Sequence, residues 1–427
     1  MRAFVDLWDE ILIERYGIEN PKFRRFRYGV QVNSLGLTEQ QPENNVYRIL
    51  IEMLAVTLSK KARARAVQLP AWNEALGLPR PWDQQWSMRM QQIMAFETDL
   101  LEYEDLFEGN SVVDTKVEAL KTSARYELKT IESQGGALES IDYMKSRLVE
   151  SNTLRLQNIE SKQTTVVGVN KYINTEESPL VSGDGGIMVV DPLVEKDQVD
   201  RLNKWRASRN QTSVENALNN LRKAALAGKN IMPASIEAAK AGATTGEWAQ
   251  EMRNIYGEYR GPTGVAAGIS NQTEGLDEIR SAVDAVSDKL GERLKFLIGK
   301  PGLDGHSNGA EQIASRARDC GMKIEYEGIR LTPQELVDTV KTSKAHVIGL
   351  SILSGSHIPL VQDMMTLLAE EGLMNIPVVV GGIIPEEDKS KLLQMGIAKV
   401  YTPKDFEMNT IMMDIVNLAE PREIAAE

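Results

Sequence analysis

The sequence predicts an α/β protein that ends in a doubly wound parallel sheet. Five short apolar runs near the C-terminus have the length of buried strands, and helical patterns separate them. The strand-like runs are residues 294–298, 322–326, 345–350, 376–380 and 398–401. The helical runs begin at Gly309, Thr332, Ile358 and Pro385 and near Lys404. Such sheets bind ligands at the carboxyl ends of their strands, so we expect a site in the loops there.

The first 110 residues or so alternate helices with two short strands, which indicates part of a parallel α/β layer. Helical spacing covers residues 2–16, 42–56 and 82–101, and the strand-like runs are 26–32 and 65–69. Two strands are too few for a stable parallel sheet, so this layer is expected to belong to a larger one.

The middle of the chain is predicted to be helical. Residues 111–160 show two helical runs that separate near 134–136, and helices resume over 214–259. Residues 174–212 are dense in charged and polar side chains and are interpreted as an interdomain linker. The predicted domains are residues 1–173, a linker and helical segment over 174–290, and residues 291–427.

Composition limits the class of protein. A length of 427 residues is enough for two or three domains, and no apolar run reaches the roughly 18 residues of a membrane span. Residues 1–6 lack the apolar region of a signal peptide, and the net charge of −12 argues against a general nucleic-acid surface. The single cysteine, Cys320, excludes a disulfide framework and is expected to be inert packing. We expect a cytoplasmic homo-oligomer that binds neither nucleic acid nor a membrane.

The segment 300–309, Lys-Pro-Gly-Leu-Asp-Gly-His-Ser-Asn-Gly, directly follows a strand-like run. Neutral imidazole is a common metal ligand, and its second nitrogen usually donates to a carboxylate or carbonyl that orients the ring. Asp304 can be that carboxylate for His306, and Lys300 can keep Asp304 ionised. The alternative is a solvated loop whose polar residues share no role. Two other candidate loops at neighbouring strand ends favour the metal-ligand interpretation.

Those loops contain Ser351 and the pair Gly381-Gly382. Ser351 either caps the next helix or hydrogen-bonds a buried heterocycle. The two glycines either form a tight turn or leave room where a bulky ligand tail presses on the backbone. His357 is interpreted as an exposed residue at a helix start, and His346 as a structural residue of a strand.

Together these motifs resemble the cobalamin-binding domain of the adenosylcobalamin-dependent acyl-CoA mutases. The matching positions are Lys300, Asp304, His306, Gly309, Ser351, Leu353, Gly381 and Gly382. The resemblance implies a flavodoxin-like domain that binds cobalamin base-off, with His306 in place of dimethylbenzimidazole on cobalt. The displaced nucleotide tail is then expected in a slot lined by the Ser351 loop and the two glycines. One departure is the segment 401–405, Tyr-Thr-Pro-Lys-Asp, where this family usually has a Gly-Pro-Gly-Thr turn.

The N-terminal part resembles the same family in residues 34–46, 74–79 and 168–172. The stretch 63–73 looks closer to members that act on ethylmalonyl-CoA, because the Gln-Ser-Leu-His-Thr-Asn stretch of the methylmalonyl-CoA enzymes is absent. The resemblance implies a radical isomerisation of ethylmalonyl-CoA to methylsuccinyl-CoA, with methylmalonyl-CoA as the alternative substrate. It also implies a catalytic role for Glu97, at the position of a glutamate near the adenosyl ribose.

The substrate domain of this family is an eight-stranded TIM barrel, of which the chain is expected to contain only the last two or three βα units. The family's substrate tyrosine and histidine belong to the other part of the barrel. A partial barrel leaves strand edges unpaired, so the remaining strands are expected from a longer reading frame or a second polypeptide. The rival interpretation is a corrinoid carrier without mutase chemistry, against which the mutase-like segment 34–79 argues.

Overall fold

The computed structural model describes residues 1–176, 178–181, 186–188, 191–265, 276–402, 404–405 and 407–421. The chain forms two compact units. One unit contains Met1–Met188 together with Pro262–Glu427, and the other contains Val189–Gly261.

The C-terminal sheet has five parallel strands in the order β4-β3-β5-β6-β7. The strands are β3 Lys295–Gly299, β4 Lys323–Glu325, β5 Val347–Ile352, β6 Val378–Gly382 and β7 Lys399–Tyr401. This order, with the second strand outside the first, is that of a flavodoxin-like sheet and confirms the prediction. The register aligns Ser351 with Gly381 and Gly381 with Tyr401, so the carboxyl ends of β5, β6 and β7 lie level.

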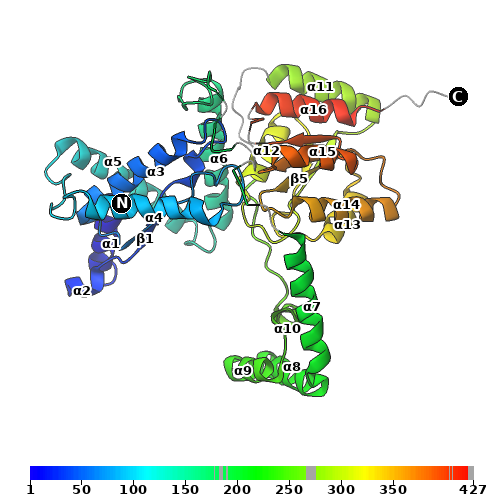
Figure 1. The fold of residues 1–427 in the computed structure, drawn as a ribbon, viewed down its shortest axis with the longest axis horizontal. Helices are drawn as coiled ribbons and strands as arrows, with labels where there is room; N and C mark the ends of the chain where they lie inside the picture. The colour runs from blue at the N-terminus through cyan, green and yellow to red at the C-terminus, as the bar shows by residue number, and fades with distance from the viewer. Residues whose placement is uncertain are drawn as a thin grey trace. The chain divides into compact units, whose positions relative to one another are not determined.

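Helices cover both faces of this sheet (Figure 1). One face carries α11 Leu276–Leu290, α12 Asn308–Asp319 and α16 Met408–Ala419, and the other carries α13 Pro333–Ser343, α14 His357–Glu370 and α15 Glu386–Gln394. Alternating side chains of β3 divide between the two cores: Phe296 and Ile298 belong to the first, and Leu297 to the second. The predicted helices therefore begin within a few residues of their expected positions.

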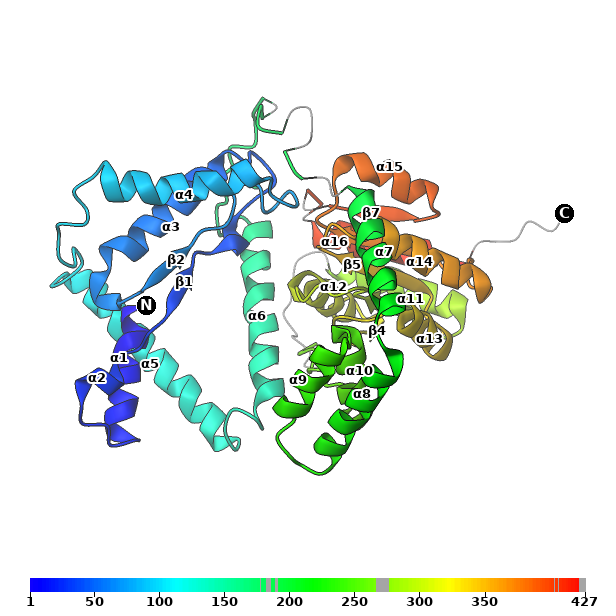
Figure 2. The same ribbon diagram turned by 60° about the horizontal axis from the view of Figure 1, so that its bottom comes forward.

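The N-terminal part carries the parallel strands β1 Gly29–Gln31 and β2 Ala66–Gln68 (Figure 2). Its helices are α1 Arg2–Glu14, α2 Pro21–Arg24, α3 Asn44–Leu58, α4 Pro81–Phe96, α5 Ser111–Ser133 and α6 Ile141–Glu160. Ile49 and Met53 of α3 pack with Met94 of α4 in a small core beside the strands. Among the described residues β1 and β2 pair only with each other, so each keeps an unpaired edge. The predicted partial α/β layer is confirmed.

The second unit consists of the helices α7 Pro192–Ser208, α8 Gln211–Leu226, α9 Met232–Ala241 and α10 Thr245–Tyr256. The structure differs here from the predicted linker over 174–212, because residues 192–208 form α7. Asp191 caps this helix by accepting the Leu193 N–H at 2.9 Å, and Pro192 occupies its first turn. A dense charge pattern suits an exposed helix as well as a linker. Residues 177, 182–185 and 189–190 of the expected linker lie outside the described residues.

None of the helices in the described ranges has the length and apolar composition that a membrane span requires.

Candidate functional site

Three loops that follow strands of the large sheet meet at one edge. β3 leads into residues 300–307, β5 leads into 353–356, and β6 ends in Gly381-Gly382 before α15. Because the strands are parallel, their carboxyl ends share this edge. The structure therefore brings together the three loops that the sequence singled out.

A chain of charged groups holds His306 in its loop. Lys300 Nζ lies 2.6 Å from Asp304 Oδ2, and the two side chains are only 0% and 5% exposed. Asp304 Oδ1 accepts the His306 backbone N–H at 3.0 Å and lies 2.6 Å from the ring Nδ1. A ring that donates its Nδ1–H to a carboxylate presents the lone pair of Nε2. The His306 side chain is 79% exposed, so this nitrogen is accessible to a ligand.

Asp304 is held as a carboxylate and links the loops. Burial alone raises its pKa, but hydrogen bonds from Lys300 and from the backbone and ring of His306 outweigh burial and lower the pKa to about 2. Asp304 Oδ2 also accepts the backbone N–H of Leu353 at 3.3 Å, and Lys300 Nζ lies 3.5 Å from the Ser351 carbonyl oxygen. The loop after β5 is thereby tied to the loop that carries His306.

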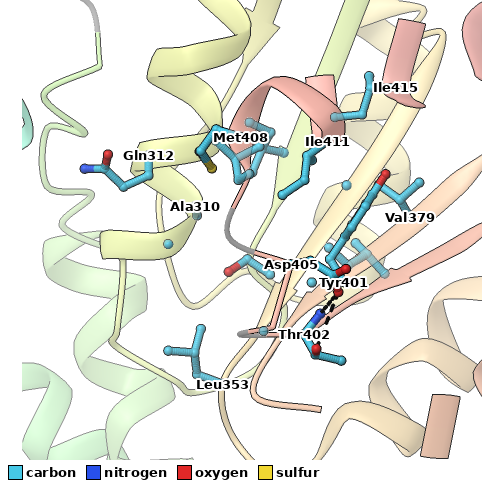
Figure 3. A pocket seen from close by; sticks show the side chains of 18 of the residues that line it. Ala310, Gln312, Leu353, Val379, Tyr401, Thr402, Asp405, Met408, Ile411 and Ile415 are labelled. Atoms are coloured by element: carbon cyan, nitrogen blue, oxygen red, sulfur yellow. Dashed lines mark hydrogen bonds between the residues drawn. The ribbon is translucent and has the colours of Figure 1, made fainter. Parts of the chain in front are cut away.

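A cavity of about 360 Å³ opens beside the same loops (Figure 3). Five of the predicted residues line it: Gly309, Ser351, Leu353, Gly381 and Gly382. Most of the other lining side chains are apolar, among them Ile298 and Met408. Apolar cavities of about 300–1,000 Å³ with a few polar groups are typical of small-molecule sites. The cavity therefore suits an apolar heterocycle better than a charged group.

The wall of the cavity that follows β7 contains none of the site residues predicted from the sequence. Tyr401 ends this strand, and Met408 begins α16 on the same wall (Figure 3). The Thr402 N–H donates to Asp405 Oδ2 at 2.8 Å, so the Asp405 side chain closes the turn after β7. Pro403 lies outside the described residues. The signal for this wall was the parallel order itself, since the end of β7 lies at the same edge as the predicted loops.

Gly381 and Gly382 differ in what an added side chain would meet. Gly382 has a φ of +147°, and a Cβ there would lie 1.9 Å from the carbonyl oxygen of Ile352 on β5. This glycine is demanded by the close approach of two strands. A Cβ on Gly381 would meet the Cβ of Tyr401 at 3.7 Å, which is an ordinary contact. Only Gly381 therefore fits the interpretation of a glycine that leaves room for a ligand.

We expect Gly382→Ala to destabilise the folded chain by about 3 kcal/mol or more, because the added methyl group clashes with backbone and the dihedral becomes strained. Gly381→Ala should change the free energy of unfolding by less than about 1 kcal/mol. Denaturant unfolding of the full chain, followed by circular dichroism, measures both values. Equal destabilisation by the two substitutions would contradict this division of roles.

The other histidines and the cysteine have structural environments. The prediction of an exposed His357 is wrong: the residue is 4% exposed, because the first turn of α14 packs toward Asp388 of α15. His346 is structural as predicted, since its Nδ1 accepts the Lys295 N–H at 2.9 Å. Cys320 is fully buried, and burial raises the pKa of its thiol to about 11, which confirms inert packing.

Glu97 lies at the C-cap of α4, and its side chain is exposed. In the described part of the chain this carboxylate makes no hydrogen bond or ion pair that would join it to the His306 loop. Its catalytic role stays a prediction.

In this flavodoxin-like sheet, the loop after β3 presents His306 beside an apolar cavity and holds it with the buried carboxylate of Asp304. These features are those of a cofactor-binding domain. The sequence model of the B12 binding domain matches residues 294–405, and that of methylmalonyl-CoA mutase matches residues 1–258. The chain therefore belongs to the methylmalonyl-CoA mutase family and carries a C-terminal B12-binding domain, which confirms the resemblance.

Within this family the chain is similar to two proteins named ethylmalonyl-CoA mutase. It is 68% identical to the one from Cereibacter sphaeroides over 100% of its own length, and 59% identical to the one from Methylorubrum extorquens over 98%. The methylmalonyl-CoA mutase of Escherichia coli is 31% identical over 98% of the chain. The chain spans 65%, 61% and 59% of the length of these relatives, respectively.

The residues present fit cobalamin. Within the described ranges no three His, Cys, Asp or Glu side chains gather as a site for a bare metal ion. A single accessible imidazole suits a metal whose other ligands belong to its own cofactor. The adjoining apolar cavity offers space for a heterocyclic base, and Ser351 supplies a hydroxyl among its lining groups.

Proposed function

We propose that this chain binds adenosylcobalamin with His306 Nε2 as the lower ligand of cobalt and with the displaced nucleotide tail in the 360 Å³ cavity. The observation that carries this proposal is the exposed imidazole held at 2.6 Å by a buried carboxylate, which is itself paired with a buried lysine. In this arrangement Asp304 orients the ring and fixes its tautomer, and Lys300 keeps Asp304 ionised. The cofactor-binding roles of Gly309, Ser351, Leu353 and Gly381 are supported by their place in the cavity wall. Gly382 also lines the cavity, but the Ile352 carbonyl group already accounts for its missing side chain.

The reaction that we propose for the whole protein is the isomerisation of ethylmalonyl-CoA to methylsuccinyl-CoA. The identities of 68% and 59% to proteins named for this substrate, against 31% for a methylmalonyl-CoA mutase, support it. When bound, the cofactor supplies radical chemistry through its weak carbon–cobalt bond. The protein holds the cofactor, positions the thioester and excludes water. The family match over residues 1–258 favours this function over a corrinoid carrier, which needs no substrate domain.

We further propose that the acyl-CoA site is completed by barrel strands outside these 427 residues, on the same polypeptide or on a second one. The open edges of β1 and β2 and the 65% coverage of the Cereibacter sphaeroides relative support this. Glu97 is proposed as a catalytic residue of that completed site on the strength of the resemblance. We also propose that the whole protein is a homo-oligomer in the cytoplasm.

Competition between two substrates tests the proposed reaction. The full-length protein that contains these residues is loaded with adenosylcobalamin and supplied with ethylmalonyl-CoA and methylmalonyl-CoA, and the products are separated by mass spectrometry. We expect kcat/KM to be at least about tenfold higher for ethylmalonyl-CoA, since one methylene in a hydrophobic pocket is worth about 1–3 kcal/mol. A preference for methylmalonyl-CoA would refute the substrate and leave the cofactor site standing. Absence of turnover with bound cofactor would favour the carrier.

A further inference from the structure

A buried histidine–aspartate pair joins two segments that wall the cavity. His357 is the first residue of α14, and Asp388 lies in the first turn of α15. The ring Nε2 of His357 lies 2.9 Å from Asp388 Oδ2, and the side chains are 5% and 14% exposed. The other carboxylate oxygen of Asp388 accepts from Lys391 Nζ at 2.6 Å.

The place of this pair in the chain connects it to the cavity. The segment that leads to His357 contains Ser351 and Leu353, and the strand before α15 ends in Gly381-Gly382; all four residues line the cavity. The ladder between β5 and β6 ends where Ile352 faces Gly382. Between segments 353–357 and 383–388, both fully described, the His357–Asp388 contact is the only hydrogen bond. This contact therefore holds the two loops together beyond the end of the sheet.

A role in packing alone does not account for a histidine at this position. Its Nδ1 is buried and has no hydrogen-bond partner among the described residues, and such a group is destabilising by about 1–3 kcal/mol. Burial raises the pKa of Asp388, but the contacts with Lys391 and His357 outweigh it and lower the pKa, so the acceptor stays ionised. A charged acceptor makes the bond to the ring stronger and more directional than an apolar contact.

We infer that His357 and Asp388 are positioning residues for the nucleotide tail of the cofactor, because they fix the relative position of two neighbouring loops that form part of the wall of the cavity proposed for the tail. This inference rests on the proposed binding of cobalamin with its tail in the cavity. Neither residue lines the cavity, so both act through the loops that they connect.

Two ligands separate this role from general stability. Cobinamide has the corrin ring and cobalt of cobalamin but lacks the nucleotide tail. Binding of adenosylcobalamin and of cobinamide to the full 427-residue chain is measured by equilibrium dialysis for the wild type, His357→Asn and His357→Gln. Asparagine is too short to reach Asp388, whereas glutamine places an amide N–H near the position of Nε2. We expect His357→Asn to weaken binding of adenosylcobalamin about tenfold and of cobinamide less than about twofold, and His357→Gln to recover most of the loss.

The matched control is His346→Asn. His346 also bonds across the sheet, to the Lys295 N–H at 2.9 Å, but it precedes β5 at the opposite edge. This substitution should leave the ratio of the two affinities unchanged even where it lowers Tm. If His357→Asn leaves the ratio of the adenosylcobalamin and cobinamide affinities unchanged, the positioning role is overturned. If that variant does not fold, Asp388→Asn, which keeps the shape of the acceptor, must shift the ratio in the same direction. Failure of the wild-type chain to bind either ligand would refute the proposed function itself.

Discussion

Replacing His306 with alanine is expected to abolish coordination of cobalt by a nitrogen of this protein. The chain has three histidines, and neither of the others can substitute: His357 is buried against Asp388, and the Nδ1 of His346 is bonded before the start of β5. Electron paramagnetic resonance of cob(II)alamin bound to the full chain measures the effect. The wild type should show the hyperfine coupling of one protein nitrogen, and His306→Ala should show none.

Two further variants sharpen this test. Asp304→Asn keeps the shape of the orienting group but removes its charge, so we expect the nitrogen coupling to remain and the affinity to fall by about 10- to 100-fold. His346→Ala removes a histidine that is outside the site and should leave both coupling and affinity unchanged. Unchanged coupling in His306→Ala would refute the assignment of the lower ligand.

A polypeptide of these 427 residues alone is expected to bind cobalamin and yet show no turnover of ethylmalonyl-CoA or methylmalonyl-CoA above background. The C-terminal sheet has a core on each face and needs no other strands to fold, so we expect the loop that carries His306 to be in place in this polypeptide. The N-terminal layer instead has only β1 and β2 in the described part of the chain. Two strands cannot enclose a thioester and keep water from a reactive intermediate.

The measurement is a stopped assay with mass-spectrometric detection of methylsuccinyl-CoA and succinyl-CoA. Addition of a polypeptide that carries the remaining barrel strands should restore turnover, because the open edges of β1 and β2 can then pair. The matched control is the same mixture with His306→Ala, which should lose activity although the barrel is complete. Robust turnover by the 427-residue chain alone would show that the additional barrel strands are not needed for catalysis.

Much of the cofactor domain could be predicted because its signals are local. Each strand of the sheet is an apolar run of strand length, and each following helix shows the hydrophobic periodicity of a helix. Both patterns can therefore be recognised without knowledge of distant contacts. Lys300, Asp304 and His306 lie within one loop, where the chain itself keeps their side chains within reach of one another. The three-loop site followed from the parallel order of the strands.

Other features depended on which distant residues pack together. The buried environment of His357 requires α15 beside α14, and the wall formed by Tyr401 requires β7 beside β6. Residues 192–208 have the same composition whether they form a linker or the exposed helix α7, so composition could not decide between them.

The sequence alone determined the order of the strands along the chain, the loop that presents His306 and the likeness to the acyl-CoA mutases. Only the tertiary structure decided that Gly382 is required by the Ile352 carbonyl group while Gly381 leaves space, and that a histidine–aspartate pair closes the gap between two loops. The physical reason is the range of the forces involved. Backbone preference and hydrophobic periodicity act over a few residues, whereas burial, cavity shape and hydrogen bonds between elements arise only when segments far apart in sequence come into contact.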